Sequence, residues 1–474
     1  MAGIGFRIGH LLRSDDLSSK LGGVIASIIL SCGPWLCTIL SIGLLSALIP
    51  PEQDPMDRAL FRVIINYTYL ASLIGFSVIE MTTTRYLADA LYLKQERVIP
   101  TLFAQMSAVI LLLSSCIGYL FYYTTDLPWQ VTVVAVACLA VVTAIWFAMI
   151  FLSACKDYVH ITLSFFIGTL VCVFTVLVFT RLVKTGLLGL CLGFTLGQIA
   201  TFVLLAARIF KEFGVGFLAP RDFFSHCAKN RILIGVGFFY ALAVWVDKLV
   251  FWFVPQTSEK VATTFFKSSA YDAGLFLAYL FVVPSMAYFL VKVETEFYTV
   301  YRRYFSLIDQ APLTFIEDAR REIIKTIRSN MGGLALFQGF FTVGALIFAP
   351  HIVESAGLPL LYITVFRYGL FACTLHTFAL FTNILILYFD LPKIVAWNYA
   401  LFAFLNGSLA YLSTQLDYRY HGIGYALSSL TVLVISLLGL RRVLRDLEFH
   451  IFMKQPLNKP SALPLILEKV SLKD

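Results

Sequence analysis

The chain has 474 residues, of which 59% are hydrophobic and only 14% are charged, and its formal net charge is +8 at pH 7. So few charged side chains cannot cover an ordinary soluble protein of this length. The composition therefore predicts a membrane protein. It also makes nucleic-acid binding a poor inference from the positive charge, because such a charge can equally report how the chain is oriented in a membrane.

Apolar stretches recur along the chain, and each is long enough to cross roughly 30 Å of hydrocarbon as a helix. They lack alternation of polar and apolar residues, which excludes a closed β-barrel and predicts an all-α polytopic protein. We expect about twelve spans. Their predicted bounds are 21–49, 60–84, 99–122, 128–154, 158–180, 187–208, 232–254, 269–292, 333–355, 359–388, 393–414 and 421–440.

Most of the 36 Lys and Arg residues fall in alternate connections between these spans. Cytoplasmic loops retain positive charge during insertion, so this asymmetry predicts that both termini are cytoplasmic. The basic residues gather around 208–231, 292–330 and 441–473, whereas the connection 50–58 is rich in acidic residues and is expected on the outer side.

The longest polar interval is expected to form an amphipathic cytoplasmic insertion at about 295–330. Within it we predict a helix over about 315–329, separate from the span that follows. Its apolar positions recur every four residues, at Phe315, Ala319, Ile323 and Ile327. This helix should lie on the inner membrane surface or dock a partner. The surface is favoured, because four basic residues suit anionic headgroups: Arg320, Arg321, Lys325 and Arg328.

The signatures of common soluble enzymes are missing. The sequence has no Gly-Lys-Ser/Thr phosphate loop, no His-Glu-x-x-His and no Gly-x-Ser-x-Gly. Its nine Cys residues stand singly, without the spacing of metal ligands. We therefore expect no enzyme activity, no metal and no cofactor, and a membrane glycosyltransferase of unfamiliar kind is the one weak enzymatic alternative.

Two adjacent charges stand in the middle of the apolar stretch VWVDKLVFWF, residues 244–253. A charge inside a span is expensive and usually faces protein, a partner charge or a water-filled cavity. Trp245, Lys248 and Trp252 fall at i, i+3 and i+7 of one helix. This spacing predicts that the Lys248 ammonium lies between the two indole rings, while Asp247 faces elsewhere.

The partner of Asp247 is expected on another helix. Arg367, in the tenth span, could pair either with Asp247 or with Asp272. A structural salt bridge between helices and a position in a transport path are equally open alternatives. The candidate path residues are Trp245, Asp247, Lys248, Trp252, Asp272 and Arg367.

A second set of charged residues lies at the predicted cytoplasmic ends of spans. These residues could close a gate or dock a partner, and headgroup anchoring or local pairing is an equally good explanation. The set consists of Arg85, Asp89, Glu294, Glu296, Arg302 and Arg303.

Several stretches of the sequence are distinctive when taken together. They are MAGIGF at the start, SCGPWLCTIL in the first span, TRYLAD at 84–89, WVDKLVFW at 245–252, PSMAYFLVKVETEFYTVYRRYF at 284–305 and LFTNILILYFD at 380–390. These stretches resemble the Pel exopolysaccharide inner-membrane transporter family, PelG. The resemblance extends along essentially the whole chain, and the segment ending ETEFYTVYRRYF is its most distinctive part.

The resemblance implies a fold of the multidrug, oligosaccharidyl-lipid and polysaccharide flippase superfamily, in which two six-helix lobes surround a central cavity. The number of predicted spans agrees with it. The expected parts are an N-terminal amphipathic segment (1–20), an N-lobe (21–210), a cytoplasmic linker (211–231), a C-lobe (232–440) and a cytoplasmic tail (441–474).

The resemblance also implies a function without enzyme activity. The protein would move a growing N-acetylgalactosamine-rich polysaccharide across the bacterial inner membrane, together with a cytoplasmic glycosyltransferase and membrane subunits of the PelD and PelE types. Two alternatives share this chain's features: a flippase for lipid-linked oligosaccharides and a membrane scaffold that does not transport. An ion-coupled drug exporter is disfavoured, because the first span holds no carboxylate for a cation.

Overall fold

The computed structural model describes residues 54–216, 222–308 and 311–452, together with a few isolated positions before residue 54. Apart from those isolated positions, the predicted span at 21–49 lies outside the described residues, as do the N-terminal segment 1–20 and residues 453–474 of the predicted tail. Within the described ranges the chain is almost entirely helical, and the one sheet there is a two-stranded antiparallel hairpin.

The first group of helices begins directly after Asp54. The Asp54 side chain accepts a hydrogen bond from the Met56 amide, and Pro55 occupies the first helical position, where it needs no amide hydrogen. The helices are α3 (Pro55–Tyr92), α4 (Ile99–Tyr123), α5 (Trp129–Ala154), α6 (Tyr158–Leu177) and α7 (Gly186–Phe213). Each contains most of one predicted span.

The second group begins after the short α8 (Phe223–Lys229). Its long helices are α9 (Arg231–Phe253), α13 (Leu313–Ile347), α15 (Ile363–Tyr388), α16 (Pro392–Thr414) and α17 (Ile423–Arg445). Its shorter helices are α10 (Ser269–Leu280), α11 (Val283–Tyr288), α12 (Glu294–Leu307), α14 (Ala349–Ser355) and α18 (Leu447–Phe452). The hairpin of β1 (Glu259–Lys260) and β2 (Phe266–Lys267) joins α9 to α10, with Glu259 opposite Lys267.

Among the described residues, 10 helical stretches are long and apolar enough to cross a membrane. This confirms the predicted all-α polytopic class. α16, which matches the predicted span 393–414, is a helix of 23 residues outside this group of ten. Its buried Asn398 and Asn406 lower its hydropathy, yet it packs between α9 and α17 as the spans do.

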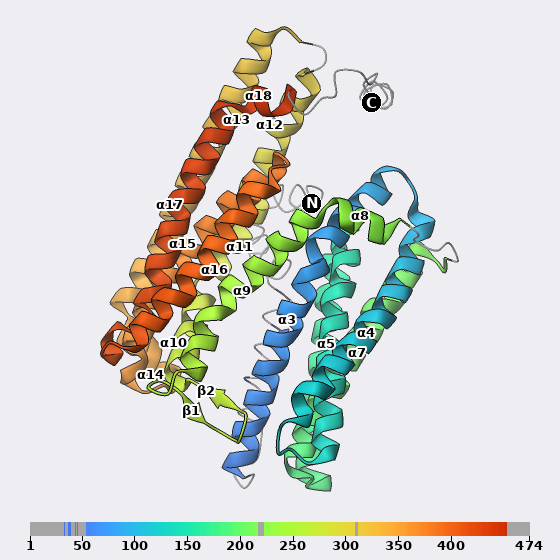
Figure 1. The fold of residues 1–474 in the computed structure, drawn as a ribbon, viewed down its shortest axis with the longest axis vertical. Coiled ribbons are helices and arrows are strands. Elements are labelled where there is room, and N and C mark those ends of the chain that lie inside the picture. Colours follow the sequence, from blue (N-terminus) through green and yellow to red (C-terminus); the bar gives the residue numbers. More distant parts are fainter. Residues whose placement is uncertain are drawn as a thin grey trace, which may run out of the picture.

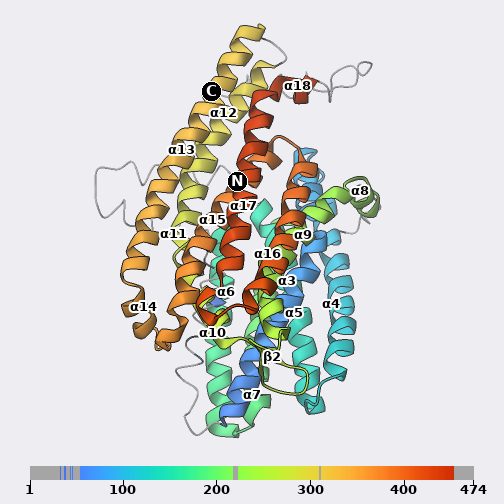
Figure 2. The ribbon, with the colours of Figure 1, turned by 60° about the vertical axis from the view of Figure 1, so that its left-hand side comes forward.

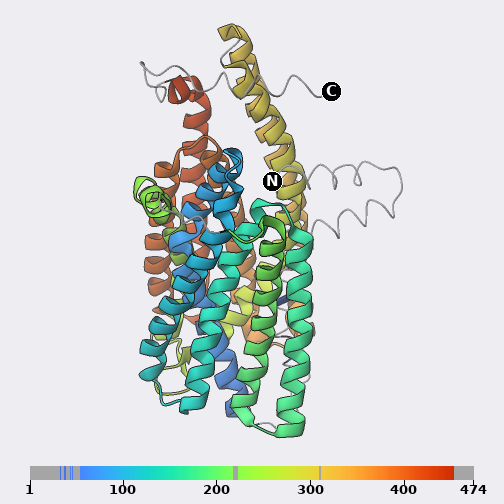
Figure 3. The same ribbon diagram turned by 90° about the vertical axis from the view of Figure 1, so that its right-hand side faces the viewer.

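The described helices form two bundles, which meet along α3 and α9 (Figure 1). Helices α3 to α7 pack on one another, as do α9 to α17, and α3 against α9 is the main contact between the two sets. Figure 3 shows the first bundle in front of the second. One end of the molecule carries α8 and α18, and the opposite end carries the β-hairpin and α14. We refer to them as the α18 end and the hairpin end.

The predicted separate helix at 315–329 does not exist as such. α13 runs without interruption for 35 residues to Ile347, so the predicted boundary near 329 is wrong. Ile316, Ala319, Ile323 and Ile327 are buried in a cluster that includes Phe297 and Tyr304 of α12. The apolar face therefore docks within the chain. Phe315, by contrast, is 59% exposed, because a helix turns every 3.6 residues and a stripe spaced by exact fours drifts off the buried face.

Candidate functional site

Helix α9 separates the two bundles and presents a different face to each. Trp245, Leu249 and Trp252 pack with the first bundle, where the Trp252 ring stacks on Tyr67 of α3 with centroids 5.0 Å apart. Ala243 and Phe251 pack in the core of the second bundle. We call the contact between α3 and α9 the seam.

Asp247 points into the second bundle and is fully buried. Its Oδ2 accepts a hydrogen bond of 2.7 Å from the Tyr271 hydroxyl of α10, and its Oδ1 lies 3.4 Å from the Lys248 ammonium. The Tyr271 ring also stacks on Phe251 at 3.7 Å. Both carboxylate oxygens are thus engaged, Oδ2 by Tyr271 of α10 and Oδ1 by the neighbouring Lys248 of α9 itself.

The Lys248 ammonium lies among three aromatic rings and not between two Trp rings. Its Nζ is 5.6 Å from the Trp245 ring, 5.5 Å from Tyr279 and 5.9 Å from Tyr425. It donates a hydrogen bond of 2.8 Å to the Val244 carbonyl. Helical side chains lean toward the N-terminus of their helix, so Lys248 reaches back toward Val244 and away from Trp252. The prediction of Trp245 as a neighbour is confirmed and that of Trp252 is wrong.

Beside Lys248, a chain of hydrogen bonds crosses the second bundle from Tyr279 to His376. The hydroxyls of Tyr279 and Tyr425 share a hydrogen bond of 2.8 Å, and the Tyr425 hydroxyl lies 2.6 Å from His376 Nδ1. The sequence reasoning missed these tyrosines, because nothing in a single sequence distinguishes them among 23 Tyr residues. We call this group the polar cluster: Asp247, Lys248, Tyr271, Tyr279, His376 and Tyr425.

Asp272 and Arg367 do not form the pairs that were predicted. Both oxygens of Asp272 accept from the indole Nε1 of Trp252, each at 2.9 Å. Arg367 is exposed and makes no ion pair with any residue that the structure describes. The preceding residue, Phe366, is fully buried, and adjacent residues of a helix point in different directions. Arg367 therefore lies on the outward side of α15.

The middle of the seam is a very close approach of two backbones. A Cβ atom on Gly237 of α9 would lie 2.1 Å from the Ser77 carbonyl oxygen of α3. One turn further along α3 lies Glu80, which is partly buried. Glu80 was also missed, although it falls inside the predicted span 60–84, where any acidic residue is informative.

At the α18 end an ion pair closes the seam. Arg85 Nη1 lies 2.9 Å from Oδ1 of Asp390, in the turn between α15 and α16, and Arg85 Nε lies 4.0 Å from Asp89 Oδ2. The pair joins the two bundles directly, because Arg85 belongs to α3.

The other charged candidates lie on α12. Glu294 is its first residue, Glu296 is partly exposed and Arg302 is exposed. Arg303 Nη1 pairs with Glu322 of α13 at 2.8 Å, within the second bundle. The structure therefore brings Arg85 and Asp89 to the seam and places the α12 residues away from it.

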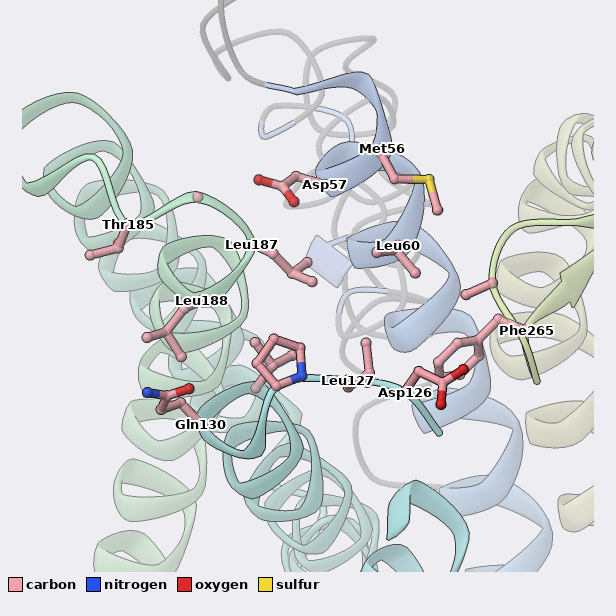
Figure 4. Close-up of a pocket in the computed structure, with 14 residues that line it drawn as sticks. Met56, Asp57, Leu60, Asp126, Leu127, Gln130, Thr185, Leu187, Leu188 and Phe265 are labelled. Carbon is pink, nitrogen blue, oxygen red and sulfur yellow. The ribbon is translucent and has the colours of Figure 1, made fainter. Parts of the chain in front are cut away.

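At the hairpin end there is a hollow of about 590 Å³. Figure 4 shows that its walls come from α3, from the turns before α5 and α7, and from Phe265 in the hairpin. Its polar groups are two carboxylates, an amide and a hydroxyl, and they belong to Asp57, Asp126, Gln130 and Thr185. Hydrogen-bonding groups beside an apolar wall are typical of sites for polar ligands that also have apolar faces.

Comparison with known proteins gives a family and a fold. The family model of the PelG exopolysaccharide exporters (EPS-E) matches residues 1–452. A MATE protein solved in its straight conformation aligns with a TM-score of 0.60 and 13% identity over 93% of this chain and 98% of that one. An outward-facing multidrug resistance MATE transporter of the MOP superfamily gives 0.60 and 14% over 93% and 98%.

A third similar structure is a MOP-superfamily transporter from Pyrococcus furiosus, with a TM-score of 0.58 and 13% identity over 93% of this chain and 98% of that one. No curated protein matches the chain. At these identities the solved structures show the fold alone, and they confirm the predicted fold of about twelve helices.

Proposed function

Since the chain belongs to the PelG exopolysaccharide exporter family and has the fold of MOP-superfamily transporters, we propose that it carries a growing N-acetylgalactosamine-rich polysaccharide from the cytoplasm to the periplasm. The family and the fold are those of transporters and not of enzymes. The proposal places the protein in a bacterial inner membrane, with the α18 end and both termini in the cytoplasm. It assigns polymer synthesis to a cytoplasmic glycosyltransferase and assembly to PelD-like and PelE-like subunits.

The observation that carries the proposal is the aromatic face that α9 presents to α3. Sugar rings have apolar faces that stack on aromatic side chains, and their hydroxyls need polar partners. Trp245, Trp252 and Tyr67 supply the rings along the seam, and Glu80 supplies a carboxylate. When the bundles separate, these side chains face the opening, so we assign them direct contact with the polymer.

The buried charges take a supporting role in this proposal. Asp247 and Lys248 hold α9 against α10 and α17, and Asp272 fixes the indole of Trp252. Arg367, exposed toward the hairpin end, and the hollow lined by Asp126 and Gln130 are proposed contacts for polymer that is leaving.

Transport in inverted membrane vesicles tests the proposal. The vesicles carry the protein, the glycosyltransferase and the membrane subunits, and they receive labelled UDP-N-acetylgalactosamine. Labelled polymer should become protected from added glycosidase, and the protection should vanish when this chain alone is omitted. Synthesis that stops with its omission would identify a scaffold or synthase subunit instead. Accumulation of lipid-linked intermediates would identify a flippase.

The ion pair between Arg85 and Asp390 is proposed as a cytoplasmic gate. Arg85→Glu places like charges on the two bundles, so the closed arrangement should weaken and export should fall. Half-exposed pairs contribute about 0.2–1 kcal/mol, so we expect a loss of up to roughly 5-fold. The double variant Arg85→Glu with Asp390→Arg should recover most of the export rate. Arg303→Glu disrupts a similarly exposed pair inside one bundle and should leave export unchanged; an equal loss there would refute the gate.

A further inference from the structure

One face of α13 carries three cations in a row. Arg321, Lys325 and Arg328 are separated by four and three residues, so they lie on one side of the helix. All three are exposed, and with Ile324 and Ser329 they line a shallow depression. Arg321 pairs with Asp318 at 3.3 Å. Lys325 and Arg328 form no ion pair with any residue in the described part of the chain.

The same face continues as a lipid-facing surface. Spacings of four and three residues lead from Arg328 to side chains that are 80%, 77%, 55% and 67% exposed: Leu336, Phe340, Val343 and Ile347. These residues belong to a helix that is long and apolar enough to span a membrane. Figure 2 shows α13 at the left edge of the bundle, with α12 and α15 on its inner side. Large apolar side chains so exposed on an outer span are in contact with hydrocarbon.

The length of this face places the cations at a membrane boundary. From Ile347 back to Arg328 the helix rises ~29 Å, which matches a hydrocarbon core of roughly 30 Å. Lys325 and Arg321 then lie ~5 and ~11 Å further out, at the depth of the lipid headgroups. The charges therefore lie at the depth of lipid headgroups, and the apolar stripe lies at the depth of the acyl chains.

A glycine leaves a gap in the side chains where the charged and apolar parts of this face meet. Gly332 is exposed and lies between Arg328 and Leu336 on this face, and a Cβ atom there would meet nothing within 4 Å. We propose that this stripe binds an anionic phospholipid, with its phosphate against Lys325 and Arg328 and its acyl chains along Leu336 and Phe340. The continuity of the charged and apolar faces favours a lipid over an acidic protein or a soluble phosphate, since neither would cover both.

Native mass spectrometry of the full chain with phosphatidylglycerol and phosphatidylcholine tests this site. The wild-type protein should retain phosphatidylglycerol preferentially. Lys325→Gln with Arg328→Gln should weaken that retention by about 10-fold or more, because each basic residue near an anionic surface adds substantially to binding. Inorganic phosphate should not displace the lipid; if it does, the site binds free anions.

Two matched pairs of variants distinguish a specific lipid site from diffuse charge attraction. Arg441→Gln with Arg442→Gln removes two exposed cations near the C-terminal end of α17. This variant should retain phosphatidylglycerol almost as well as the wild-type protein. An equal loss there would mean diffuse charge attraction and no site. Gly332→Leu fills the gap between Arg328 and Leu336 without changing the charge, and it should also weaken lipid retention. Gly344→Leu is the control, because a Cβ atom at Gly344 also meets nothing within 4 Å, and it should not weaken retention. Unchanged lipid retention in the Gly332 variant would refute the proposed position of the lipid along this face of α13.

Discussion

Lys248→Met should reduce the amount of folded protein in the membrane by about 10-fold or more. The substitution leaves the fully buried carboxylate of Asp247 with a single partner, the Tyr271 hydroxyl. Removing one member of a buried pair costs about 3–5 kcal/mol, because an uncompensated charge remains. That cost is a large part of the roughly 5–15 kcal/mol that separates folded from unfolded proteins. Membrane abundance and thermal stability in detergent measure it.

The double variant Asp247→Asn with Lys248→Met should recover most of the lost stability. It removes both charges together, and the side-chain amide oxygen introduced in place of the carboxylate would still accept from Tyr271. Exchanging a whole buried pair for neutral groups is often close to neutral, so the two changes should be strongly non-additive. Lys292→Met is the matched control. Lys292 also lies over an aromatic ring, 5.7 Å from Tyr288, but it is exposed and should tolerate the change.

The same double variant separates a structural role from a role in the path. Export per molecule should stay near the wild-type rate, because Asp247 is buried inside the second bundle and both its oxygens are engaged there. An abundant protein that exports nothing would show instead that the charges act on the polymer. The sequence left these two roles equally open, and burial is the property that it does not report.

Span positions were predictable because hydrocarbon thickness imposes a length on apolar stretches. All of the predicted spans after the first contain described helices. The predicted helix boundary near 329 was wrong for a physical reason. A polar stretch within a long helix looks like a connection between helices when only the sequence is considered. The structure shows that Ile323 and Ile327 are buried against α12. Tertiary packing of α12 thus decides whether the segment lies on the membrane or extends from it.

The candidate site was predictable only as far as one helix reaches. Spacing along α9 correctly places Trp245 beside Lys248, but the other two rings arrive from α10 and α17. No periodicity in a single sequence relates residues that are so distant along the chain. For the same reason the predicted pairing of Arg367 with Asp247 or Asp272 rested on charge alone, and Arg367 is instead exposed on α15. Glu80 could have been identified from the sequence, because an acidic residue inside a predicted span is informative by itself.

Gly237→Ala should reduce export by about 10-fold or more while the protein remains abundant. The added Cβ would lie 2.1 Å from the Ser77 carbonyl oxygen, a backbone atom that cannot turn aside. Overpacking of this kind costs about 1–3 kcal/mol. Here the cost falls on the contact between the bundles and not on the core of either, so it disfavours the closed seam. A shift of that size changes the population of two states by roughly 5- to 150-fold.

Gly235→Ala is the matched control on the same helix, because its Cβ would meet only the Phe239 ring at 3.8 Å. Export should be near normal in this variant. Thiol labelling of Met81→Cys, in a background without the native cysteines, reports how often the seam opens at the α18 end. Labelling should rise with Gly237→Ala and stay constant with Gly235→Ala. Normal export together with increased labelling in the Gly237 variant would show that transport does not require α3 and α9 to close, whereas unchanged labelling would show that the seam accommodates the added methyl group.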